Sequence, residues 1–165
     1  MMEQFINAVR QSIATENWYA ALGMALTLPD ICGRLTDPEI PSGKRYAAWW
    51  EEYVQERYTV PDHVFLSGRD AYALRCAYLH EGRDDVAEQR AREALSSFVF
   101  VAPRPGWNVH CNQRDDILQL QVNIFCGDVC DGATAWMESH RDDEAVQERL
   151  RGLIEIHSLL GDFAF

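Results

Sequence analysis

The sequence predicts a mainly α-helical protein with a minor β part, built as a helical bundle around one buried helix. Most apolar residues recur at helical spacing, and one segment, about residues 67–81, is apolar on nearly every face. The apolar period shortens to two residues only between about 98 and 124, which predicts a small antiparallel β-ribbon before the last helices. A length of 165 residues with 47% hydrophobic content fits one domain, 1–165.

Three helices are expected ahead of the central segment. The apolar spacing places them at about 3–15, 18–28 and 44–58. Pro29 is expected to end the second helix, because proline lacks an N–H donor, and Asp30 is expected to cap the short turn that follows. The aromatic residues of the third helix lie at helical spacing, which favours a place in the core over a base-stacking surface.

The central helix has clear signals at both ends. Ser67 can cap its N-terminus, Asp70 can return a bond to the N–H of the cap, and Gly82 can end the helix in the left-handed conformation. In its apolar stretch the strongly polar side chains are Arg75 and His80. Burying an unpaired guanidinium is costly, so Arg75 is expected to have a partner or a function.

The chain after the central helix changes from helical to strand-like patterns and back. Alternation of apolar and polar residues from Leu118 to Ile124 is typical of a half-buried strand, and Asp142 or Asp143 can cap the last helix. In chain order we expect a helix, three short strands and two helices, at about 84–96, 98–102, 107–111, 117–124, 128–139 and 143–160.

Charge and hydropathy narrow the possible functions. The net charge is −11, with a pI near 4.8, which argues against a general nucleic-acid binder. Residues 69–92 carry five basic and five acidic side chains, so this segment repels a phosphate least. No apolar run reaches the roughly 18 residues of a membrane span, and the first residues lack the basic region of a signal peptide. We expect a cytoplasmic protein without a membrane partner.

The cysteines predict free thiols. There are five, an odd number, in a chain expected in a reducing compartment. A zinc site could be assembled from Cys126, Cys130 and the pair His110-Cys111, but no paired C-x-x-C motif is present. Burial as small apolar residues is favoured, and we expect neither a metal nor another cofactor.

Arg75 and His80 also carry a resemblance. Their spacing, Arg-x4-His, is similar to the motif of HEPN domains, helical bundles many of which are metal-independent ribonucleases. Segments 28–33, 66–68 and 125–128 resemble a family of uncharacterised bacterial proteins with the same layout. The resemblance implies a homodimer whose groove holds Arg75 and His80 as catalytic residues, with RNA or a nucleotide as the ligand.

Helix geometry agrees with a site shared between two copies. Five positions separate Arg75 from His80, which corresponds to about 140° around the helix and roughly 7.5 Å along it. One helix is therefore not expected to bring both side chains onto one small group, whereas two helices across a two-fold axis could. Cleavage without metal needs a base, an acid and positive charge at the phosphate, and Asp30, Asp70 and Tyr72 are expected to support the pair.

Two other classes of function remain open. Arg75 can simply pair with a buried carboxylate, for which Asp30 is the candidate, while His80 caps its own helix. The protein would then be a non-enzymatic interaction protein, of the immunity or antitoxin type or a degenerate HEPN bundle, or else a nucleotide-binding module. The acidic charge favours an interaction protein, as does Cys76, which stands where active HEPN ribonucleases often have a polar residue.

Overall fold

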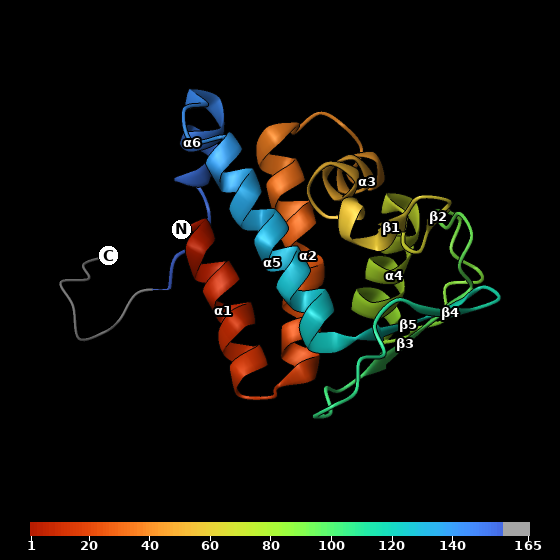
Figure 1. Cartoon of the computed structure of the whole chain (residues 1–165). Helices are drawn as coiled ribbons and strands as arrows, with labels where there is room; N and C mark the ends of the chain where they lie inside the picture. The colour runs from red at the N-terminus through yellow and green to blue at the C-terminus, as the bar shows by residue number, and fades with distance from the viewer. Residues whose placement is uncertain (157–165) are drawn as a thin grey trace.

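The fold is mainly α-helical with a minor β part, which confirms the predicted fold class (Figure 1). The computed structural model describes residues 1–156. Its six α-helices in this range are α1 (Met2–Ala14), α2 (Trp18–Thr36), α3 (Ser42–Tyr53), α4 (Gly68–Glu81), α5 (Val122–Ser139) and α6 (Glu144–Leu150). A 3₁₀ turn, η1 (Gln55–Tyr58), follows α3.

Helix α2, and not the helix predicted at about 67–81, holds the centre of the bundle, because it contacts all five other α-helices of the described range. It continues through Pro29 to Thr36, so the prediction that Pro29 ends the helix and that Asp30 caps a turn is wrong. A proline inside a helix removes one hydrogen bond. Here Pro29 is itself buried, and Leu28 and Cys32 on either side are fully buried, so core packing outweighs that loss.

Helix α4 has the predicted ends. Ser67 Oγ accepts the N–H of Asp70, and Gly82 takes the left-handed conformation with φ of 66°. The first part of the helix is largely buried, and the last turn, residues 79–81, is exposed. Its start lies directly on α3, because a Cβ added at Gly68 would lie 2.5 Å from the carbonyl oxygen of Ala47.

Asp70 does not return a bond to the Ser67 N–H as predicted. Its carboxylate is 2% exposed and accepts the backbone N–H groups of Glu93, Ala94 and Leu95, at 2.7 to 3.3 Å from Oδ1. The Ser67 hydroxyl donates to Oδ2 at 3.1 Å. The helix predicted at 84–96 is therefore absent at both ends: the N–H groups of 93–95 bind Asp70, and residues 84–86 pair with 96–98 in an antiparallel bridge.

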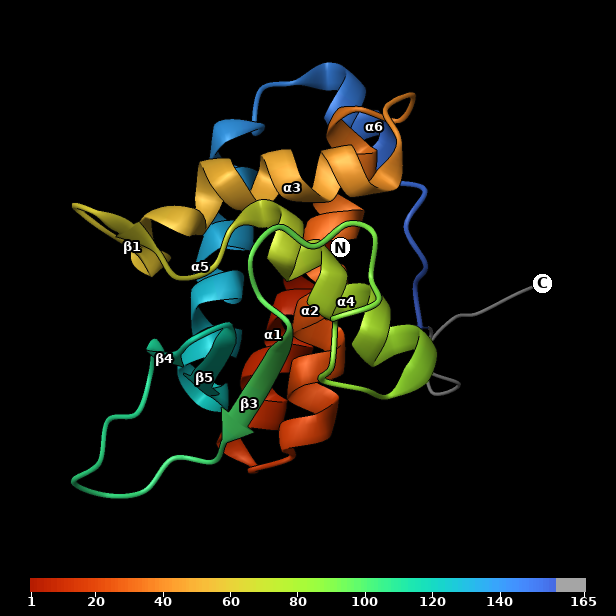
Figure 2. The ribbon, with the colours of Figure 1, turned by 90° about the vertical axis from the view of Figure 1, so that its right-hand side faces the viewer.

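The β part differs from the predicted antiparallel ribbon. The strands β3 (Ser97–Val101), β4 (Asn112–Arg114) and β5 (Ile117–Gln121) form one sheet in the order β3-β5-β4. Strand β5 pairs antiparallel with β4 but parallel with β3, and Phe98 lies opposite Leu118. Alternation predicted strands here but not their partners, because segment 102–111 is long enough to carry the chain across the sheet (Figure 2).

The remaining boundaries shift for local reasons. The alternating run predicted to 124 ends at Gln121, where α5 begins. The strand predicted at 107–111 is found instead as β4, and a separate two-stranded hairpin joins β1 (Thr59–Val60) and β2 (His63–Val64). Asp143, one of the two predicted candidates, caps α6. The helix ends at Leu150. The predicted end near Leu160 lies outside the described residues.

Replacing Asp70 tests the buried carboxylate. We expect Asp70→Asn to lower the free energy of unfolding by about 2–4 kcal/mol, because three backbone N–H groups lose a charged acceptor. Urea denaturation measures the change. Asp85→Asn is the matched control, since the exposed Asp85 accepts only the N–H of Ala87, and its effect should stay within about 0.5 kcal/mol. Equal effects of the two substitutions would contradict a special role for Asp70.

Candidate functional site

Three of the five candidate site residues meet in one place. Asp30 lies on α2 directly after Pro29, Arg75 lies in the middle of α4, and His80 lies in the last turn of α4. Arg75 Nε donates to Asp30 Oδ2 at 2.6 Å, which confirms the predicted pairing. Arg75 Nη1 lies 3.0 Å from His80 Nε2.

The contact between Arg75 and His80 contradicts the expectation that one helix cannot bring them together. The two residues start far apart around α4, but an arginine side chain is long and flexible enough to span the axial separation. Asp30 fixes the Nε edge of the guanidinium, which leaves Nη1 directed toward the exposed end of the helix. A single copy of the chain therefore assembles the pair.

The hydrogen bond defines the form of the imidazole. Arginine can only donate, so His80 Nε2 accepts, and the ring is neutral with its proton on Nδ1. Partial burial lowers the pKa of Arg75, but the Asp30 carboxylate and then Cys76 more than offset this, so the pKa is raised overall. The guanidinium stays charged beside a neutral base.

Part of the guanidinium remains available to a ligand. Arg75 has five N–H donors, and the contacts described use one on Nε and one on Nη1. Within residues 1–156, no oxygen or nitrogen atom accepts from Nη2. The Arg75 side chain is 21% exposed and that of Asp30 is 19% exposed, so the pair is at the surface rather than enclosed in the core.

The other two candidates lie elsewhere. Asp70 binds the backbone of 93–95, as described above. The Tyr72 hydroxyl lies 3.1 Å from Ser42 Oγ, and its ring packs against Tyr46 with 5.4 Å between centroids. Neither residue contacts Arg75 or His80 through a hydrogen bond in the described range.

Tyr46 is a neighbour of the site that the sequence did not reveal. It is fully buried on α3, and its hydroxyl has no hydrogen-bond partner among residues 1–156. Burial raises the pKa of this hydroxyl well above its usual value, and the charge of Asp30 raises it further. Its spacing in the sequence indicated a core aromatic, which is correct for the ring, but no local signal placed it beside Asp30.

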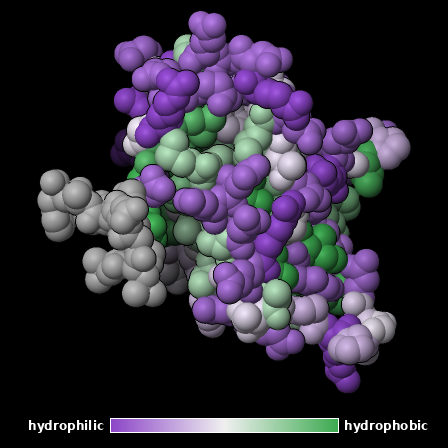
Figure 3. All heavy atoms as spheres, turned by 90° about the vertical axis from the view of Figure 1, so that its left-hand side faces the viewer, coloured by the Kyte–Doolittle hydropathy of each residue, from purple (hydrophilic) through white to green (hydrophobic). Residues whose placement is uncertain are grey.

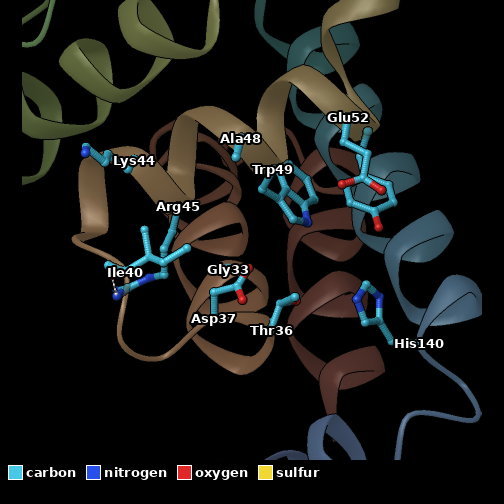
Figure 4. Close-up of a pocket in the computed structure, with 11 residues that line it drawn as sticks. Gly33, Thr36, Asp37, Ile40, Lys44, Arg45, Ala48, Trp49, Glu52 and His140 are labelled. Carbon is cyan, nitrogen blue, oxygen red and sulfur yellow. Dashed lines mark hydrogen bonds between the residues drawn. The ribbon is translucent and has the colours of Figure 1, made fainter.

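One hollow of the described surface lies away from the pair. A cleft of about 130 Å³ lies between the C-terminal end of α2, one face of α3 and His140. Figure 4 shows the side chains that line it. Lys44 and Arg45 lie toward one end, and Glu52 and His140 toward the other. Figure 3 shows a face on which hydrophobic residues form patches among hydrophilic ones. Another groove is lined by Phe5, Met24 and Ile154.

The cysteines are free thiols, three of them buried in the core. Burial raises the pKa of Cys126, and it raises that of Cys130 to about 11. Within residues 1–156, no three His, Cys, Asp or Glu side chains are grouped so that they could hold a metal ion. In the same range, no helix has both the length and the apolar character needed to cross a membrane.

Comparisons of the chain with protein-family models, with curated proteins and with solved structures found no match. The case for a functional site at Arg75 therefore comes from the geometry of its residues alone. A charged donor group, anchored by a carboxylate, contacts a neutral imidazole at the surface.

The contribution of the Arg75–Asp30 pair to the free energy of unfolding can be measured. We expect Arg75→Ala to lower the free energy of unfolding by about 2–3 kcal/mol, because it leaves the partly buried Asp30 carboxylate unpaired. The double variant with Asp30→Ala should lose less than the sum of the two single losses.

The matched control is Arg83→Ala, whose partner Glu81 is exposed and 3.7 Å away, and its effect should be within about 0.5 kcal/mol. Additive losses at Arg75 and Asp30 in urea denaturation would show that the two residues are not coupled.

Proposed function

We propose that this chain is a metal-independent, HEPN-like endoribonuclease that acts in the cytoplasm through Arg75 and His80. The observation that carries the proposal is the contact of 3.0 Å between Arg75 Nη1 and His80 Nε2 at an exposed helix end. It places a phosphate-binding group beside a neutral base, which are two of the three elements that cleavage without metal requires.

The chemistry follows from these two side chains. The free N–H groups of Arg75 bind the non-bridging oxygens of a phosphodiester, and the substrate displaces Arg75 from His80 Nε2. His80 Nε2 then takes the proton of the 2′-hydroxyl as the 2′-oxygen forms its bond to phosphorus. The bond from phosphorus to the 5′-oxygen breaks. The products are a 2′,3′-cyclic phosphate and a 5′-hydroxyl.

The leaving 5′-oxygen needs a proton, and we place its donor in a second copy of the chain. His80 of that copy, in its protonated form, supplies the proton at a groove between the two α4 ends. The exposed side chains of Leu79, next to His80, and of Tyr19 support an interface here. Tyr19 lies near the same helix end, because the Tyr78 hydroxyl donates to its carbonyl oxygen.

The decisive experiment is cleavage of mixed RNA by the pure protein. We expect cleavage to persist in EDTA and to leave 2′,3′-cyclic phosphate ends. His80→Ala should lower the rate by about 10²-fold or more, the scale for loss of a general acid or base. Arg75→Lys should also cleave poorly, because an ammonium does not reproduce the planar fork.

Arg83→Lys provides the matched control and should cleave at the wild-type rate, since Arg83 is exposed and lies beyond α4. Cleavage should weaken steeply as salt rises. Undiminished cleavage by His80→Ala would identify a contaminating nuclease and reject the proposal.

Sedimentation tests the shared groove separately. We expect a dimer at micromolar concentration. Leu79→Glu should shift it toward monomer and lower cleavage, because the substitution places one carboxylate from each copy at the interface, where the two repel each other. A wild-type protein that cleaves RNA as a pure monomer would remove the second copy from the mechanism.

A non-enzymatic interaction protein, or a nucleotide-binding module, is the second candidate. One observation favours it: Arg75 already uses Nε and Nη1 within the chain, as expected of a structural ion pair. The net charge of −11 agrees with a protein partner rather than RNA. A protein inert toward RNA, with the stability losses of Arg75→Ala intact, would favour this candidate.

A further inference from the structure

We propose that His110 is a pH-sensitive latch, which in its neutral form holds segment 102–111 on the junction of β5 and α5 and on protonation releases it. The latch is separate from Arg75 and His80. It involves the segment that leaves the end of β3, projects from the body of the protein and returns to β4 (Figure 2).

The closed state depends on one nitrogen of the ring. The backbone N–H of Gln121 donates to His110 Nδ1 at 3.3 Å. Gln121 is the last residue of β5 and directly precedes α5, so this bond ties segment 102–111 to the point where strand becomes helix. An N–H donor at Nδ1 requires an unprotonated nitrogen, so the neutral ring carries its proton on Nε2.

The second nitrogen gives the ring an alternative partner. Nε2 is buried without a hydrogen-bond partner among the described residues, and it lies 3.8 Å from Asp128 Oδ2, too far for a good hydrogen bond. The same oxygen accepts the Tyr58 hydroxyl at 3.1 Å, and Arg57 Nε lies 3.4 Å from Oδ1. A protonated ring that pairs with Asp128 must therefore move toward it.

That movement breaks the bond to Gln121. Once His110 carries protons on both nitrogens, its Nδ1–H faces the Gln121 N–H, and two donors oppose each other. The ring gains Asp128 only by leaving Gln121. The two partners thus define a closed and an open position of the same side chain.

Backbone strain beside the latch favours opening. Cys111, the next residue, has φ of 54°, a left-handed conformation that residues other than glycine rarely adopt. Segment 102–111 is otherwise weakly attached: its residues 102–108 are exposed, and Trp107 is 61% exposed under the Arg104 guanidinium. Loss of one anchoring bond therefore has a large local effect.

The titratable groups around the ring set the direction of the pH effect. Burial lowers the pKa of His110 below the usual value of about 6.5. Burial raises the pKa of Asp128, although Tyr58 and Arg57 lower it, and burial together with Asp128 raises the pKa of Cys111 to about 11. Because the folded pKa of His110 is depressed, the latch is fully closed above the unfolded pKa and opens as the pH falls through the folded pKa.

Hydrogen exchange with pH-corrected protection factors tests the latch. Between about pH 7.5 and pH 5, we expect protection of Gln121 and of 109–111 to fall in wild type. The loss should begin near the usual histidine pKa of about 6.5, approach about tenfold per pH unit, and level off below the lowered pKa of the closed ring. His110→Asn keeps an acceptor at the position of Nδ1 but cannot titrate, so its protection should be independent of pH. His63→Gln, which changes a surface histidine that contacts Gln113, should behave as wild type.

The outcomes distinguish His110 from its neighbours. Protection that does not change with pH in wild type overturns the latch, and so does an equal loss in His110→Asn, which would assign the effect to another group. Nuclear magnetic resonance of the intact wild type supplies a test that does not depend on the variant's folding. The His110 ring and the Gln121 amide should titrate with one midpoint below that of free histidine, and two different midpoints would overturn the proposal.

Discussion

The continuity of α2 through Pro29 is the constraint on which both the core and the candidate site depend. A helix ending at Leu28 would lose residues 30–36, among them Gly33, whose Cα lies so close to α3 that an added Cβ would be 3.1 Å from Arg45 Cβ. It would also remove Asp30 from the helix, and with it the charge that fixes Arg75. One lost backbone hydrogen bond at proline is small beside the apolar surface that the continuous helix buries.

Sequence signals predicted the features of the fold that depend on neighbouring residues. Both ends of α4 followed from Ser67 and Gly82, because a cap and a left-handed stop act within a few residues. The pairing of Arg75 with Asp30 was also predictable, since an arginine in an apolar helix needs a carboxylate, and few carboxylates interrupt apolar stretches. The helix expected at 84–96 failed because its N–H groups bind the distant Asp70.

Sequence patterns failed to predict one feature of the candidate site and one of the sheet for the same reason: both depend on contacts that residue spacing does not specify. Periodicity gave the direction of each side chain at its Cα but not the path of a long side chain, so the contact of Arg75 with His80 was missed. Alternation gave the strands but not the parallel pairing of β3 with β5, because nothing in either strand specifies the direction of its neighbour. Tyr46 was recognised as core, while its closeness to Asp30 depends on how α3 crosses α2.

The close approach of α4 to α3 has a consequence for the history of this fold. Gly68 cannot be exchanged for any other amino acid without moving a helix, because a Cβ would overlap the Ala47 carbonyl. On either side of Gly68, the Ser67 hydroxyl accepts the N–H of Asp70, and the Asp70 carboxylate accepts the N–H of Glu93. Descendants of a common ancestor should keep the pattern Ser-Gly-x-Asp ahead of an apolar helix even where Arg75 and His80 have been replaced. The pattern would then identify common ancestry whether or not the Arg75 and His80 site is kept. A chain that has the pattern but lacks these two polar residues would be a relative with a different function.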